Sequence, residues 1–143
     1  MQKWNGRLQD SSRANLYKHI ASFKFQSYLN VCKITKFRVS MPHLRLSAHS
    51  LCIETGRWEI TNSIPVNERK CLTCKFIKDE YHFVLECLMH KDLRNVYISV
   101  YYRSRPNRKE LITNENENII NTLCVYFHKA FVIRSHHTYV KNI

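Results

Sequence analysis

Three cysteines and a histidine lie close together near the middle of the chain, at spacings that suit a metal ion. Cys71 and Cys74 are followed by His82 and Cys87, which gives the pattern C-x2-C-x7-H-x4-C. Thiolate sulfurs and an imidazole nitrogen bind zinc tetrahedrally, at about 2.3 Å and about 2.0–2.1 Å. We therefore predict a Zn²⁺ site formed by these four side chains. With four protein donors the site is closed, so the zinc is structural rather than catalytic.

Two local elements must position these donors. A tight turn has to point both sulfurs of the C-x2-C pair in one direction, and a helix is expected to carry the second pair. Asp79 is the predicted N-cap of this helix, and Glu80 is favourable near its positive end. His82 and Cys87 project about 140° apart on an ideal α-helix. We therefore expect His82 in the first turn, at the very end of the helix, where the backbone can adjust.

Chance clustering is the alternative explanation. Cys87 would then be a small buried apolar residue, and His82 a surface residue. A C-x2-C pair by itself is a weak signal, whereas four donors at these spacings beside a capped helix are much harder to obtain by accident. His90, three residues after Cys87, is a further candidate that could compete for the ion.

The length and composition predict one small helical domain. The chain has 143 residues, enough for a modest core, and 44% of them are hydrophobic. Two glycines and three prolines are too few for a sandwich built on tight turns, so the predicted fold class is mainly α. Within a single domain, 1–143, we expect an N-terminal helical part at about 11–52, a zinc-binding core at about 66–103 and a C-terminal helix at about 116–135.

The other cysteines and the hydropathy indicate the cellular environment. Cys32, Cys52 and Cys124 each stand singly in an apolar context, as reduced core cysteines do. No apolar run follows the basic start, and no stretch approaches 18 apolar residues. We expect an intracellular protein of the nucleus or cytoplasm with reduced thiols and no membrane partner.

The charge points to a polyanionic partner. The formal net charge is +12, and the basic residues are spread along the whole chain. Nucleic acid is the leading explanation for such a balance. A solvated basic surface, or a fragment separated from an acidic counterpart, is the alternative.

Apolar periodicity predicts helices before the metal array. Leu16 and Ile20 continue one stripe in a helical stretch from Ser11 to Cys32, with a break near Lys24. A second helix is predicted over Arg38–Leu51, where Ser40 as N-cap and Pro42 in the first turn avoid a clash inside the helix. The residues expected to face the core from this second helix are Leu44, Ala48 and Leu51.

Three further segments complete the expected fold. Residues 53–60 look extended with a turn at Gly56, and Trp58 is expected to belong to the core. After the array, the helix entered at His82 is predicted to resume or to run on to about Arg103, and the final amphipathic helix should pack across the others. The apolar stripe of the helix that ends near Arg103 comprises Leu93, Val96, Tyr97 and Val100.

The run from Leu44 to Arg94 resembles the zinc-binding segment that follows the polymerase domain in non-LTR retrotransposon reverse transcriptases. The resemblance implies that the four donors are the ligands and that the segment helps to bind template RNA or target DNA. An absent polymerase domain is then a possible partner. The resemblance is carried by the RLSAHSL and IETGRW blocks, by Glu68-Arg69-x-Cys71-x2-Cys74, and by Asp79-Glu80-x-His82-Phe83-x3-Cys87 with Arg94 behind it.

The chain departs from that family in two ways. Leu88, Met89 and His90 stand where the family often has a proline and a tyrosine. Polymerisation also needs metal ions held by carboxylates, and none of the three aspartates lies in a paired strand-turn setting. The resemblance therefore implies a binding module, and we expect no enzymatic activity.

Our first hypothesis is a retroelement-derived zinc module that binds nucleic acid mainly through phosphate contacts. One alternative is a structural or protein-docking module, and another is a remnant without a selected role. A thiol hydrolase based on His49 and Cys52 lacks an orienting third group. The candidate phosphate-binding residues are Arg45, Arg57, Arg69, Lys70, Lys75, Lys78 and Arg94.

Overall fold

The computed structural model describes residues 15–22, 24–46, 48, 51, 63–104 and 108–141. Over these ranges the protein is helical, and its only extended pairing is an isolated antiparallel bridge between Lys70 and Ile77. The predicted mainly α fold is confirmed. The helices are α2 (Asn15–Ile20), α3 (Tyr28–Val31), α4 (Thr35–Arg38), α5 (Ser40–Arg45), α7 (Lys91–Tyr97), α8 (Val100–Ser104), α9 (Arg108–Ile112) and α10 (Glu117–Lys141), with shorter helical turns at Val66–Glu68, His82–Glu86 and Leu88–His90.

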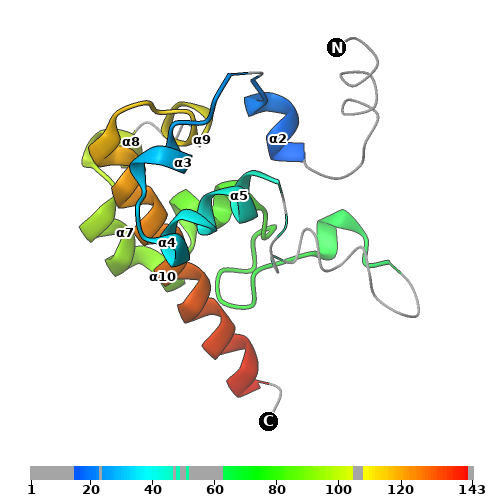
Figure 1. The fold of residues 1–143 in the computed structure, drawn as a ribbon. Helices are drawn as coiled ribbons and strands as arrows, with labels where there is room; N and C mark the ends of the chain where they lie inside the picture. Colours follow the sequence, from blue (N-terminus) through cyan, green and yellow to red (C-terminus); the bar gives the residue numbers. More distant parts are fainter. Residues whose placement is uncertain are drawn as a thin grey trace.

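The long helix α10 is the element against which four of the described helices pack. Helices α3, α4, α5 and α7 all contact it, and in Figure 1 it runs from orange to red through the molecule. The predicted C-terminal helix is confirmed, and it continues past residue 135 to Lys141. No helix of the described ranges is long and apolar enough to cross a bilayer. The side chains that α10 buries include Ile120, Leu123, Cys124, Tyr126, Phe127 and Ala130.

The N-terminal part breaks where the sequence predicts. Helix α2 ends at Ile20 and α3 begins at Tyr28, so the break near Lys24 is confirmed. Leu16 and Ile20 are buried in the common core, as their spacing predicts. The predictions for residues 11–12 and 53–60, with Gly56 and Trp58, lie outside the described residues.

Helix α5 is shorter than predicted, and its expected cap is wrong. Val39, rather than Ser40, precedes the helix, and Val39 has a right-handed helical backbone that continues directly from α4. The N–H of His43 therefore finds a main-chain acceptor, the carbonyl of Val39 at 3.3 Å, without a side-chain cap. The Ser40 hydroxyl instead donates to the carbonyl of Lys36 at 3.4 Å.

The early end of α5 changes which residues reach the core. Leu44 and Leu51 are fully buried, as predicted. Ala48 is exposed, because the helix stops at Arg45 and the periodicity that placed Ala48 on the inner face no longer applies.

The helix predicted to reach Arg103 is interrupted. Helix α7 ends at Tyr97, and Ile98 takes an extended backbone with φ −109° and ψ 122°. This change of direction buries Ile98 and leaves Val96 and Val100 exposed at 76% and 64%. Helical structure resumes in α8, so the chain reaches about Arg103 in two helices, and the predicted apolar stripe does not form one buried face.

The buried Tyr126 hydroxyl ties α10 to the segment that carries His82. It donates to the carbonyl of Val84 at 2.9 Å, within a fully buried environment. We expect Tyr126→Phe to lower the free energy of unfolding by about 0.5–1.5 kcal/mol, measured by urea denaturation. Tyr101→Phe removes a hydroxyl from a half-exposed tyrosine and should change stability less. Equal losses for both variants would contradict this role.

Candidate metal centre

Cys71 and Cys74 lie in a hairpin-like segment, Arg69–Lys78, which we call the cysteine loop. The main-chain N–H of Cys71 donates to the carbonyl of Phe76 at 2.7 Å, and the N–H of Lys78 donates to the carbonyl of Arg69 at 2.8 Å. These bonds close the loop from both sides. The predicted tight turn of the C-x2-C pair is therefore present, and its two ends are held by main-chain hydrogen bonds.

One residue of the cysteine loop has an unusual backbone. Lys75 has φ 64°, in the left-handed region that favours glycine, and its N–H donates to the carbonyl of Cys71 at 2.9 Å. A non-glycine residue in this region costs roughly 1–2 kcal/mol. The surrounding hydrogen bonds must offset this cost, which is a common feature of segments that serve a site.

The second pair of donors follows the loop directly. Asp79 Oδ1 accepts a hydrogen bond from the N–H of His82 at 2.8 Å, which confirms the predicted capping role. The helical turn that begins at His82 ends at Glu86, and Cys87 has φ −57° and ψ 124°. Cys87 thus lies one residue past the turn rather than inside the helix, a correction to its predicted place.

A π-helical turn brings His82 and Cys87 together. The N–H of Cys87 donates to the carbonyl of His82 at 2.7 Å, a hydrogen bond between residues five apart. On an α-helix these residues would project about 140° apart. The wider turn places them one above the other, as residues four apart lie in an α-helix. The backbone adjustment near His82 that was expected from the sequence is this π turn.

The four donors converge. The Cys87 sulfur lies 3.9 Å from the sulfur of Cys71 and 4.0 Å from that of Cys74, and one donor atom from each of the four side chains falls within 4.8 Å of the others. A disulfide would need about 2.05 Å. A tetrahedral ion bound at about 2.3 Å sets sulfurs about 3.8 Å apart. The cluster could therefore hold a metal ion.

His82 fits a ligand role. Its side chain is 2% exposed, and neither ring nitrogen has a hydrogen-bond partner. Buried polar atoms nearly always have a partner, so an ion beside the ring would supply one. Nδ1 lies 3.8 Å from a carboxylate oxygen of Glu86.

The thiols influence one another's ionisation. Burial raises the pKa of Cys71, but the N–H groups of Cys74 and Thr73, the neighbouring His82 ring and the charge of Lys78 bring it down to about 6. Burial and the neighbouring thiols raise the pKa of Cys87 to about 12. Thiolates at this spacing repel one another, and a divalent ion between them would offset that repulsion.

His90 is not part of this cluster, although its spacing made it a candidate ligand. Its ring is fully buried and packs edge-on against Phe83, with ring centroids 4.9 Å apart. Burial, helped by Lys78 and Arg94, lowers the pKa of His90 to about 4, so the ring is neutral at pH 7. Its nitrogens also lack hydrogen-bond partners, but the four-donor group forms without it.

Most of the predicted phosphate-binding cations are buried. A buried cation is poorly placed to contact a phosphate at the surface. Lys70 and Lys75, which lie on the cysteine loop, are exposed. Arg57, like the His49–Cys52 pair, lies outside the described residues. The buried cations, which are 4–7% exposed, are Arg45, Arg69, Lys78 and Arg94.

Two contacts around the centre were not predicted from the sequence. Arg94 donates to the carbonyl of Cys87 at 3.0 Å and to that of Val84 at 3.4 Å, which fixes the backbone beside the last donor. No spacing rule links a side chain on α7 to these carbonyls. The approach of Glu86 to His82 could have been found, because the two residues are four apart on a helical segment.

Comparisons of the chain with protein-family models, curated proteins and solved structures found no match. The fold and site define a mainly helical protein whose four-donor cluster could hold a metal ion. The likeness to a reverse-transcriptase segment stays a prediction.

Arg94 should stabilise the turn around Cys87. We expect Arg94→Met, which keeps the length but removes the donors, to lower the free energy of unfolding by about 1.5–3 kcal/mol. Arg38→Met is the matched control, because that guanidinium donates to the carbonyl of Leu29 from a more exposed position. Urea denaturation of both variants measures the difference. A loss no larger than that of the control would show that the buried guanidinium is dispensable.

Proposed function

We propose that the protein binds one structural Zn²⁺ through Cys71, Cys74, His82 and Cys87, and that the zinc-bound protein binds nucleic acid. Three sulfurs and an imidazole favour Zn²⁺ over hard cations such as Mg²⁺ and Ca²⁺. The sulfur spacing supports tetrahedral binding. Nε2 of His82 would contact the ion while Nδ1 faces Glu86, an arrangement in which a carboxylate orients a ligating imidazole.

The ion would have a structural effect on the surface. Binding zinc fixes the cysteine loop to the turn at His82–Glu86, and the main-chain N–H of Leu88 already points at the Cys74 sulfur at 3.3 Å. A short loop held in this way cannot turn its apolar side chains into the core. Those side chains therefore stand at the surface beside its lysines.

The observation that carries the nucleic-acid proposal is the exposure of Phe76 on a loop that also carries exposed lysines. The ring is 68% exposed, and Lys70 and Lys75 are exposed on the same loop. Lysines bind phosphates, whereas an exposed aromatic ring offers a face on which an unpaired base stacks. This combination favours single-stranded RNA or DNA, bound with little sequence preference.

Docking to another protein is the second candidate, and the exposed Leu72 and Leu88 favour it. They are 53% and 63% exposed. Leu72 lies two residues before Cys74 in the sequence, and the main-chain N–H of Leu88 donates to the Cys74 sulfur at 3.3 Å. In a retroelement-derived chain, the docked partner would be a polymerase domain. This candidate makes Leu72 and Leu88 matter more for binding than the two lysines. Either function is non-catalytic.

The metal is tested on its own. We expect about one zinc per purified chain by elemental analysis, and a cobalt-substituted protein with the spectrum of a tetrahedral thiolate site. Cys74→Ser should lose the ion, whereas Cys32→Ser should keep it because Cys32 lies outside the cluster. A structural zinc contributes about 10–16 kcal/mol of apparent binding free energy, so a strong chelator should unfold at least the segment 69–87. Equal zinc in both variants would refute the site.

Nucleic-acid binding is tested by titrating zinc-bound protein with fluorescent single-stranded RNA and duplex DNA at several salt concentrations. Each phosphate contact contributes about −0.7 to the slope of log K against log salt on single strands and about −0.9 on duplex. Lys70→Ala and Lys75→Ala should each make the slope shallower. Phe76→Ala should weaken single-strand binding by about 1–3 kcal/mol.

Phe25→Ala is the matched control, because that ring is 66% exposed but lies outside the cysteine loop. It should leave the affinity unchanged. A salt-independent affinity, or equal effects of the two phenylalanine variants, would exclude the proposal. Binding that responds to Leu72→Ser and Leu88→Ser but not to the lysine variants would favour protein docking.

A further inference from the structure

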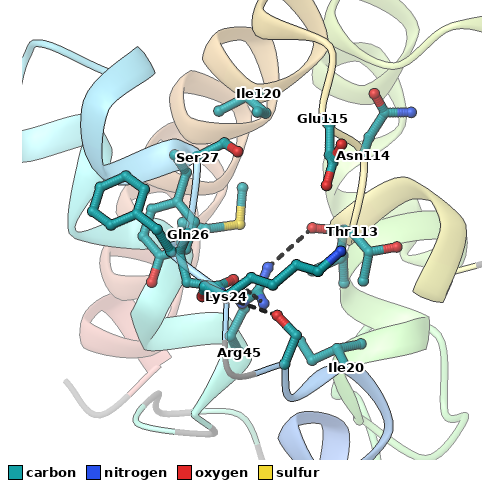
Figure 2. Close-up of a pocket in the computed structure, with 14 residues that line it drawn as sticks. Ile20, Lys24, Gln26, Ser27, Arg45, Thr113, Asn114, Glu115 and Ile120 are labelled. Carbon is teal, nitrogen blue, oxygen red and sulfur yellow. Dashed lines mark hydrogen bonds between the residues drawn. The ribbon is translucent and has the colours of Figure 1, made fainter.

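A pocket of about 240 Å³ lies away from the candidate metal centre, in a part of the protein that the proposed function does not use. Its walls come from the 20–28 segment, from α5 and from the connection between α9 and α10 (Figure 2). Pockets for drug-sized ligands measure roughly 300–1,000 Å³. The size therefore suits a small molecule or an ion.

The guanidinium of Arg45 contributes to the wall of this pocket and is a buried cation. The side chain is 5% exposed. It donates to the carbonyl of Ile112 at 3.2 Å and to the Gln26 side-chain oxygen at 2.7 Å, and it lies 5.4 Å from the centre of the Tyr28 ring. Each of these partners is neutral. Within the described part of the chain, Arg45 makes no ion pair with a carboxylate.

A buried charge without a counter-ion is unfavourable. Two hydrogen bonds use only part of the five N–H donors of a guanidinium, and neutral acceptors do not compensate its charge. Burial also lowers the pKa of Arg45 from its ordinary value, which reflects the same cost. The two hydrogen bonds hold the pocket walls together, but they leave the charge itself uncompensated.

A second cation lies at the same pocket. Lys24 is exposed, and in Figure 2 its side chain extends across the opening toward the wall that contains Thr113 and Glu115. Glu115 is exposed on that wall and contributes the opposite charge. The pocket therefore carries two positive side chains and one negative one, with the buried cation as the fixed member.

We propose that this pocket binds a small oxyanion, a phosphate or carboxylate group, through Arg45 and Lys24. A planar guanidinium matches both groups with paired hydrogen bonds, and it is the usual choice for a buried ion pair. The hydroxyl of Ser27 and the side-chain amide of Asn114 line the same space and can donate to the remaining oxygens, although one of the two amide N–H groups already donates to the Tyr102 hydroxyl at 2.7 Å. The Thr113 hydroxyl donates its proton to the carbonyl of Lys109 at 2.6 Å, so it can only accept a hydrogen bond from an attached small group. The ligand supplies the counter-ion that the described residues do not.

The zinc-bound full chain is titrated with inorganic phosphate and, separately, with acetate at constant ionic strength, and binding is followed by two-dimensional NMR and by thermal stabilisation. Saturable shifts of signals from Arg45 and Thr113 are expected. Tighter phosphate binding assigns the source as a phosphate, and tighter acetate binding assigns a carboxylate. Absence of saturable shifts with either anion overturns the proposal.

Two surface variants should move the affinity in opposite directions. Lys24→Ala should weaken anion binding about two- to fivefold, and Glu115→Gln should tighten it by a similar factor, as expected for partly exposed charges. Lys33→Ala and Glu117→Gln are exposed controls outside the pocket lining and should change nothing. Equal effects of the pocket and control variants would show nonspecific charge attraction instead of a site.

Arg45→Gln tests the buried charge directly, and anion affinity should fall at least about tenfold. If this variant does not fold, the opposite shifts of Lys24→Ala and Glu115→Gln still decide the question. Binding of single-stranded RNA should be unchanged in Lys24→Ala, because Lys24 lies outside the cysteine loop. The anion-binding proposal and the nucleic-acid proposal can therefore be refuted independently of each other.

Discussion

The hydrogen bond from the N–H of Cys87 to the carbonyl of His82 is the constraint on which the candidate metal centre depends. It widens one helical turn, so that two donors five residues apart lie on the same side. An ordinary α-helix would direct them about 140° apart and leave the C-x2-C pair facing a single donor. Arg94 and Tyr126 bind the carbonyls of this turn from α7 and α10, so the packing of the core supports the unusual geometry.

The positive charge of the protein has two different uses. Arg45 and Arg94 lie inside and donate to main-chain carbonyls. Arg45 joins segments that are distant in the sequence, whereas Arg94 holds the turn that lies shortly before it in the chain. Lys70 and Lys75 stand on the surface of the cysteine loop. A net charge of +12 therefore overstates the surface available to a polyanion. Long basic side chains suit both environments, because their stems pack as apolar groups and their heads retain several donors.

The cysteine loop shows how a metal site and a binding surface can depend on each other. The interior of the loop is occupied by main-chain hydrogen bonds and by the cysteine sulfurs. Leu72 and Phe76 are therefore exposed. Larger proteins bury such side chains in the interior, whereas a loop this short has none of its own. Exposed apolar groups beside lysines then become the part of the surface best suited to a ligand with both charged and flat apolar faces.

The sequence by itself determined the helical class, the four donors, the Asp79 cap, the break near Lys24 and the final helix, because spacing and capping are local properties. It did not determine that α5 stops at Arg45, that α7 stops before Ile98, or that Cys87 follows a π turn. Those outcomes depend on which side chains can pack against α10. Burial of Arg45 and Arg94 was likewise decided by the tertiary structure, since their acceptors are carbonyls that only folding brings within reach.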